Sequence, residues 1–191
     1  LAQGTGISAL VRAWRLTGDA KYKRAADLAL HPYRLDAANT VTSRLDDGGI
    51  CYEEVYDRGH PTCILNGFIF ALYGLADHAR AFGDPQAKAL LAEGMTSLSR
   101  HIAAYDTGYW SRYSLDPVRT WKNHWAIASP NYQRLHSEML ESLATTGGAQ
   151  IQQAARVQRH HLNSSWANII IIPAYVLYQD TTAVIKGVQG S

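Results

Sequence analysis

The sequence predicts a mainly helical protein in which helical hairpins follow one another as a curved or toroidal stack of α/α pairs. Two observations support this prediction: apolar residues recur at helical spacing in three regions, and each region is interrupted by glycine. The interruptions at Gly18, Gly83 and Gly147 recur at intervals of 65 and 64 residues, and such regular spacing is typical of repeated helical units. An irregular helical bundle with coincidentally spaced loops is the alternative.

The first hairpin is predicted near the beginning of the chain. Gly18 can take the left-handed conformation that ends a helix, and Asp19 can cap the helix that follows. The first helix carries an apolar stripe made of Ile7, Leu10, Val11 and Trp14. The second helix carries Tyr22, Ala25, Ala26 and Ala29 on one face.

The second and third hairpins repeat this pattern. Gly83, Asp84 and Pro85 supply a helix stop followed by a start, because proline suits the first turn of a helix. The third hairpin breaks at Gly147 and Gly148. The apolar residues of the second hairpin are Ile64, Phe68, Leu72 and Leu75, then Leu90, Leu91, Met95 and Leu98. Those of the third are Tyr132, Leu135, Met139 and Leu143, then Ile151, Ala155 and Val157.

Two long connections separate the hairpins, over about residues 31–62 and 104–130. Each follows the second helix of one hairpin and precedes the first helix of the next, so in a toroid both fall at the same end. Connections of this length in a compact domain are usually functional. Each contains a short β segment that is expected to form a strand, Gly49–Tyr52 in the first and Tyr109–Tyr113 in the second.

Composition limits the class of protein. The 191 residues are 47% hydrophobic, which is enough for one core, so we expect residues 1–191 to form a single domain. A net charge of +2 argues against nucleic-acid binding through a broad basic surface. The longest apolar run, residues 169–177, contains Pro173 and is too short to span a bilayer. The chain begins within a predicted helix and carries no recognisable leader, so we expect it to be part of a longer protein.

The two cysteines, Cys51 and Cys63, are too few for a disulfide framework. They could form a single bridge, or they could remain as two buried thiols. The sequence leaves both alternatives open.

Residues capable of acid–base chemistry lie in the two connections and at the start of the third hairpin. Tyr132 begins a predicted helix, and His136 lies one turn later on the same face. The connections contribute Glu54, Tyr56, Arg112 and Tyr113. An acid, phenols, a guanidinium and an imidazole are therefore expected at one rim, either as a catalytic site or as polar groups that only cap helix ends.

Signatures of other chemistries are absent from the sequence. It holds no His-Glu-x-x-His metalloprotease motif, no phosphate-binding loop and no Gly-x-Ser-x-Gly nucleophile elbow. His160 and His161 are adjacent, so on a helix they point in different directions and indicate a solvated face rather than a metal site. We therefore predict no metal and no cofactor.

Several ordered segments resemble the C-terminal domain of D-glucuronyl C5-epimerases. The resemblance covers about residues 2–162 and leaves residues 163–191 as a C-terminal extension. The segments that carry it are Ala2–Gly4, Ile7–Ala13, Tyr52–Glu54, Leu65–Leu75, Glu93–Leu98, Tyr105–Gly108 and Tyr113–Leu115, with Tyr132 and His136. The resemblance implies an incomplete α/α toroid, which agrees with the predicted repeat.

The resemblance also implies a reaction. The family converts D-glucuronate to L-iduronate within heparosan and heparan-type chains, so the implied partner is an acidic polysaccharide. It uses tyrosines and a glutamate, which here match Glu54, Tyr113 and Tyr132. Tyr56 is assigned to a further family tyrosine. The residues that the resemblance implies for positioning the uronate are Asn66, Arg112 and His136.

The sequence departs from the family pattern at two points. Val55 separates the two acids from Tyr56, and Asp116 stands where the family has an arginine. Arg112 or Arg119 is expected to contact the substrate carboxylate instead. Two other interpretations stay open: a uronate lyase on the same fold, and a non-catalytic carbohydrate-binding or helical-repeat module.

Assembly and compartment are less constrained. Members of the resembled family form dimers, and the tail could supply an apolar dimer contact or close the toroid, of which closure is favoured. The tail residues concerned are Trp166, Ile169–Ile172, Tyr175 and Tyr178. Animal members act in the Golgi lumen and bacterial members are also known, so a lumenal, secreted or cytoplasmic location is left open.

Overall fold

The computed structural model describes residues 1–34, 40–55, 61–116, 127–164, 167–171 and 173–174, and these are mainly helical, as predicted. The long helices are α1 (Ala2–Thr17), α2 (Ala20–Leu28), α3 (Leu65–Phe82), α4 (Pro85–His101), α6 (Pro130–Ala144) and α7 (Ala149–Asn163). The short elements are η1 (His31–Tyr33), β1 (Thr42–Arg44), β2 (Ile50–Tyr52), η2 (Ile102–Tyr105) and the π-helical η3 (Ala167–Ile171).

Local turn chemistry places the helix ends where the sequence predicts them. Gly18 and Gly83 both have a φ of 67°, the left-handed conformation that closes α1 and α3. Asp19 and Asp84 accept hydrogen bonds from backbone N–H groups and so cap α2 and α4. Gly148 is the N-cap residue of α7. The three predicted helical hairpins are therefore confirmed.

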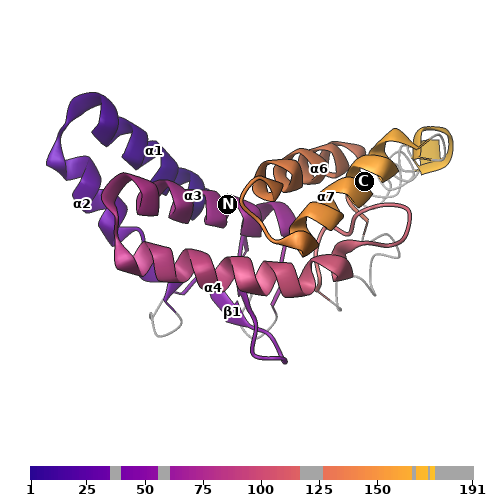
Figure 1. Ribbon diagram of the computed structural model, residues 1–191, viewed down its shortest axis with the longest axis horizontal. Coiled ribbons are helices and arrows are strands. Elements are labelled where there is room, and N and C mark those ends of the chain that lie inside the picture. Colours follow the sequence, from indigo (N-terminus) through magenta and orange to yellow (C-terminus); the bar gives the residue numbers. More distant parts are fainter. Residues whose placement is uncertain (35–39, 56–60, 117–126, 165–166, 172, 175–191) are drawn as a thin grey trace, which may run out of the picture.

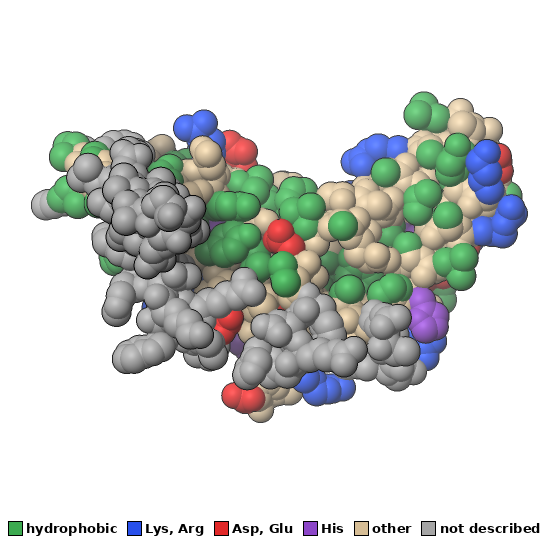
Figure 2. Space-filling model, turned by 180° about the vertical axis from the view of Figure 1, so that it is seen from behind, with side chains coloured by type: hydrophobic (Ala, Val, Ile, Leu, Met, Phe, Trp, Pro, Cys, Tyr) green, Lys and Arg blue, Asp and Glu red, His purple; other side chains and the backbone are tan. Residues whose placement is uncertain are grey.

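The first helices of the hairpins pack side by side in chain order, with α1 against α3 and α3 against α6, while α4 contacts α7. In Figure 1, α4 runs horizontally below α3, with β1 lower still, and the α1–α2 and α6–α7 hairpins rise at the two ends, so the outline is concave between them. Figure 2 shows hydrophobic side chains on the hollowed face between these ends. One core cluster runs through all three hairpins and includes Ile7, Phe68, Leu72, Leu140 and Ile151.

The first connection contains the predicted strand. β1 and β2 form an antiparallel pair in which Thr42 lies opposite Tyr52 and Arg44 lies opposite Ile50. All three β2 residues are buried, so this small sheet packs its second strand into the core. The prediction of a strand near Gly49–Tyr52 is confirmed.

The strand predicted over Tyr109–Tyr113 is wrong. Ser111 and Arg112 each make only an isolated bridge, with Asp106 and Ile127 respectively. The reason is that the backbone N–H of Ser111 donates to the side chain of Gln133 at 2.8 Å, which removes it from any strand ladder.

Within the described ranges, every helix is too short or too polar to cross a membrane.

Close packing of α1 on α3 gives a first prediction. A Cβ atom added at Gly74 would lie 2.4 Å from the carbonyl oxygen of Gly4, whereas one added at Gly6 meets no atom within 4 Å. We expect Gly74→Ala to lower the free energy of unfolding by about 1–3 kcal/mol through overpacking. Gly6→Ala should raise it by up to about 1 kcal/mol through helix propensity. Denaturant unfolding measures both, and equal effects would contradict the packing argument.

Candidate functional site

Two phenol rings and an imidazole come together at the start of α6. The ring centroids of Tyr113 and Tyr132 are 4.7 Å apart in an edge-to-face contact. The ring of His136 stacks on Tyr113 at 6.5 Å and lies 6.3 Å from Tyr132. Ser129 caps α6 by accepting a hydrogen bond from the backbone N–H of Tyr132, which fixes where the helix begins. We call Tyr113, Tyr132 and His136 the tyrosine–histidine cluster.

A carboxylate and an amide pair at the start of α3. The Nδ2 group of Asn66 donates to Oε2 of Glu54 at 3.0 Å. Glu54 lies directly on the first turn of the helix, because a Cβ atom added at Gly67 would be 2.4 Å from the Cβ of Glu54. The N-terminal end of a helix favours a negative charge. Glu54 and Asn66 form what we call the Glu54–Asn66 pair.

The backbone joins the pair to the cluster. The N–H group of Leu65 donates to the carbonyl oxygen of Tyr113 at 3.1 Å, and Asn66 is the next residue of α3. The N–H group of Leu115 likewise donates to the carbonyl oxygen of Thr62 at 3.3 Å. The second connection therefore runs alongside the start of α3. We call the pair and the cluster together the candidate site, which unites five of the seven predicted site residues.

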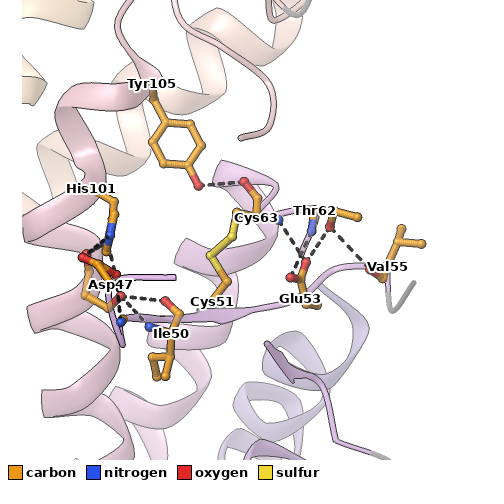
Figure 3. Close-up of a disulfide and its surroundings, with 11 residues drawn as sticks. Asp47, Ile50, Cys51, Glu53, Val55, Thr62, Cys63, His101 and Tyr105 are labelled. Carbon is orange, nitrogen blue, oxygen red and sulfur yellow. Dashed lines mark hydrogen bonds and ion pairs between the residues drawn. A yellow bond between two sulfur atoms is a disulfide. The ribbon is translucent and has the colours of Figure 1, made fainter. Parts of the chain in front are cut away.

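A buried carboxylate and a disulfide fix the chain just before α3 (Figure 3). Glu53 accepts hydrogen bonds from the hydroxyl and N–H groups of Thr62 and from the N–H group of Cys63. Cys63 is bonded to Cys51, with 5.5 Å between their Cα atoms, so the bridged alternative holds. The hydroxyl of Tyr105 donates to the carbonyl oxygen of Cys63 at 2.6 Å. Burial raises the pKa of the Glu53 carboxyl, and the hydrogen bonds from Thr62 oppose that shift.

This clamp holds a backbone conformation that an ordinary side chain rarely adopts. Cys63 has a φ of 45°, in the left-handed region, although it is not a glycine. Such a residue persists where its surroundings determine its conformation. The disulfide, the Glu53 hydrogen bond and the Tyr105 hydrogen bond all act on Cys63, and they are those surroundings.

Burial distinguishes the tyrosines of the core from those nearer the surface. The hydroxyls of Tyr52 and Tyr105 donate to backbone carbonyl oxygens, and burial raises the pKa of both phenols. These two rings are therefore part of the core. Tyr132, by contrast, is 37% exposed, and Tyr113 is half-buried.

His136 lies beneath the two rings and is completely buried. Burial lowers the pKa of its imidazole to about 3, so the ring is neutral at physiological pH. Its Nδ1 atom lies 2.9 Å from Oγ of Ser111. Its Nε2 atom, and Oδ1 of Asn66, are buried without a hydrogen-bond partner among the described residues. The expectation that the imidazole lies on the rim is wrong, because the imidazole is completely buried next to the two phenols.

Gln133 and Gln158, which the sequence did not single out, fix the backbone of Ser111 beside His136. Oε1 of Gln133 accepts a hydrogen bond from the N–H group of Ser111 at 2.8 Å, and Nε2 of Gln133 donates to Oε1 of Gln158 at 2.9 Å. The only available signal was position, because Gln133 follows Tyr132 and lies one turn before His136.

The remaining predicted residues are placed differently. Arg112 is half-buried, and its backbone N–H donates to the carbonyl oxygen of Tyr105 at 2.7 Å. Tyr56 and Arg119 lie outside the described residues, as do Trp166, Ile172, Tyr175 and Tyr178 of the tail. His160 is exposed as predicted, but the prediction is wrong for His161, which is buried 2.9 Å from Oδ1 of Asp106.

No group of three or more metal-ligating side chains occurs within the ranges that the structure describes. The candidate site consists of one carboxylate, one amide, one neutral imidazole and two phenols. Such groups can exchange protons and hydrogen-bond a polar ligand.

Comparison with known proteins finds a family match over most of the chain. A family model described as D-glucuronyl C5-epimerase C-terminus matches residues 1–161. A D-glucuronyl C5-epimerase of Caenorhabditis elegans is 30% identical over 158 residues, which are 75% of this chain and 25% of that protein. An uncharacterised protein of Methanocaldococcus jannaschii is 27% identical over 124 residues, 59% of this chain and 38% of that protein. The chain thus spans well under half the length of these relatives.

The buried imidazole predicts a pH dependence of stability. The pKa of His136 is lower in the folded chain, about 3, than the usual value of 6.5. Its contribution to stability is therefore present above pH 6.5 and is lost as the pH falls towards 3. Over this range the free energy of unfolding of the parent chain should fall by on the order of 4 kcal/mol because of His136. The His136→Gln variant should not show this part of the decrease. Denaturant unfolding at several pH values measures it.

His160→Gln is the control, because His160 is exposed. Glu53 is present in every variant, so its raised pKa cancels in the comparison. Identical pH slopes for the parent chain and His136→Gln would contradict the prediction.

Proposed function

The chain belongs to the D-glucuronyl C5-epimerase C-terminal family, and on this premise we propose that it inverts C5 of D-glucuronate to L-iduronate within an acidic, heparosan-like polysaccharide. The observation that carries the proposal is the contact of two phenol rings, Tyr113 and Tyr132. The backbone of Tyr113 is hydrogen-bonded to the start of α3, where the Glu54–Asn66 pair lies. Phenols and carboxylates are groups that can give and take protons, and here they come from separate parts of the chain to one place.

The reaction sets strict demands on such a site. The hydrogen on C5 lies next to a carboxylate, so its removal adds negative charge to a group that is already anionic. Hydrogen-bond donors must stabilise that charge as it develops. Inversion then needs a base on one face of the sugar and an acid on the other. The base takes the C5 proton, and the acid returns a proton to C5 from the opposite face.

We assign proton transfer to Glu54 and Tyr132, with Tyr113 and Tyr56 as the partner on the other face or as orienting groups. Tyr132 is suited to substrate contact because it is partly exposed, and Tyr113 packs against it. Glu54 is held by Asn66, which leaves its second carboxylate oxygen for another contact. Which group removes the proton is a question for the variants below.

We assign substrate binding to Asn66, His136 and Arg112. Asn66 and His136 each present a buried polar atom that lacks a partner among the described residues. Buried polar groups are normally satisfied; a uronate hydroxyl could donate to Oδ1 of Asn66, and a hydroxyl or carboxylate oxygen of the uronate could accept from Nε2 of His136 when that atom carries hydrogen. Arg112 is assigned to bind the substrate carboxylate only because its guanidinium carries a positive charge.

The arrangement of the hairpins is compatible with this role. We propose that the arc of α1, α3 and α6 is part of an incomplete α/α toroid, with the candidate site at one end of its helices. We propose that the chain acts as one domain on an acidic polysaccharide, and that its apolar tail closes the toroid rather than forming a dimer contact.

Removing one phenol hydroxyl or one carboxylate at a time tests the proposal. In the full-length protein, Tyr113→Phe, Tyr132→Phe and Glu54→Gln should each lower solvent-deuterium incorporation at C5 of heparosan by about 100-fold or more, because each removes a proton-transfer group. Tyr109→Phe is the matched control, since Tyr109 is 53% exposed and near Tyr113 in sequence. Absence of exchange in the folded parent protein would refute the epimerase, and an ultraviolet-absorbing unsaturated product would indicate a lyase.

Displacing Glu54 without removing it gives a second test. Gly67→Ala places a methyl group 2.4 Å from the Cβ of Glu54, so the carboxylate must move away from Asn66. We expect C5 exchange to fall at least about tenfold, because misplaced catalytic groups lose much of their effect. Exchange and thermal unfolding are measured together. Full exchange in a folded Gly67→Ala protein would exclude Glu54 from proton transfer.

A further inference from the structure

Ser111 is held from three sides beneath the tyrosine–histidine cluster. Its N–H group donates to Oε1 of Gln133 at 2.8 Å, and its carbonyl oxygen accepts from the N–H group of Ala128 at 2.8 Å. Its Oγ atom lies 2.9 Å from Nδ1 of His136. Ser111, Gln133 and His136 are all completely buried, so water does not compete for these contacts.

The orientation of Gln133 is itself fixed. Its Nε2 group donates to Oε1 of Gln158 at 2.9 Å and to the carbonyl oxygen of Gln158 at 3.3 Å. The opposite end of the amide, Oε1, must then face the N–H group of Ser111. A reversed amide would place two donors against each other at Ser111 and lose both contacts with Gln158.

Counting partners locates the hydrogen between Ser111 and His136. If Nδ1 carried it, the serine hydroxyl would lack an acceptor and Nε2 would lack a donor, among the described residues. If the serine hydroxyl donates to Nδ1, only the Nε2–H group is left unpaired. Each unpaired buried polar group costs about 1–3 kcal/mol, so the second arrangement is favoured.

We propose that Ser111 and Gln133 are positioning residues that hold His136 in the tautomer with hydrogen on Nε2, and that this Nε2–H group donates to an oxygen of the bound acidic sugar. The ligand rests on the proposed function, whereas the tautomer does not. Because the imidazole is completely buried next to Tyr113 and Tyr132, the ligand can reach it only if a neighbouring ring moves, and Tyr132 is the partly exposed one.

An uncharged donor suits this place. Burial keeps the imidazole neutral, so the Nε2–H group stabilises a developing negative charge without giving its proton away. An imidazolium would instead carry an acidic proton, which it could give to the sugar in place of the phenol. His136 therefore acts as a fixed hydrogen-bond donor, and the protons that move belong to other groups.

Nuclear magnetic resonance of the whole chain labelled with 15N-histidine tests the tautomer directly. Long-range proton–nitrogen correlation should show His136 neutral at pH 7 with hydrogen on Nε2, and His136→Gln assigns the signal. Ser111→Ala should give a mixture of tautomers. Ser137→Ala is the matched control, because Ser137 is a buried serine next to His136 whose hydroxyl has no partner among the described residues.

Hydrogen on Nδ1, or a charged ring at pH 7, would overturn the proposal; if no variant folds, correlation of the ring with the backbone signals of the uniformly labelled parent chain assigns His136 instead. A tautomer unchanged in folded Ser111→Ala would overturn the positioning role. A heparosan tetrasaccharide should shift the Nε2–H signal. If the protein exchanges C5 hydrogen but this signal does not respond, the donor role fails and the function stands. If it neither binds nor exchanges, the function fails and only the tautomer stands.

Discussion

The buried carboxylate of Glu53 determines where both connections meet α3. It holds Thr62 and Cys63 through their backbone N–H groups, and the carbonyl oxygen of Thr62 in turn accepts a hydrogen bond from Leu115 in the second connection. Desolvating a carboxylate is costly unless donors surround it, so Glu53 keeps its place only while these donors keep theirs. Glu54 follows it directly and is thereby placed on the first turn of α3.

Burial then distinguishes the tyrosines of the core from those near the surface. The hydroxyls of Tyr52 and Tyr105 donate hydrogen bonds to backbone carbonyl oxygens in the core, where burial raises the pKa of both phenols. Tyr113 and Tyr132 come from a connection and from the start of a helix, where the rings meet near the surface. The same side chain thus has a structural or a chemical role according to its surroundings. With 11 tyrosines in the chain, residue type alone could not separate them.

Local signals in the sequence predicted the hairpins, because a glycine stop and an aspartate cap act within one turn, as at Gly18 and Asp19. Long-range contacts could not be predicted in this way. The strand expected near Ser111 is missing because its N–H group binds Gln133, 22 residues away. The disulfide depended on a distance between Cys51 and Cys63 that only the fold defines. Position in the second connection and at a helix start brought Tyr113 and Tyr132 into consideration, and the resemblance to a family then assigned their role.

The described part of the candidate site also constrains how a proton could move. A phenol with a pKa near about 10 acts as a base at neutral pH only beside a cation that lowers its pKa. The imidazole that contacts both phenols is neutral, because burial lowers its pKa. His136 therefore does not supply that cation. A tyrosine that takes the proton would therefore need a cation other than His136 beside it, whereas a carboxylate such as that of Glu54 needs no such cation to accept a proton.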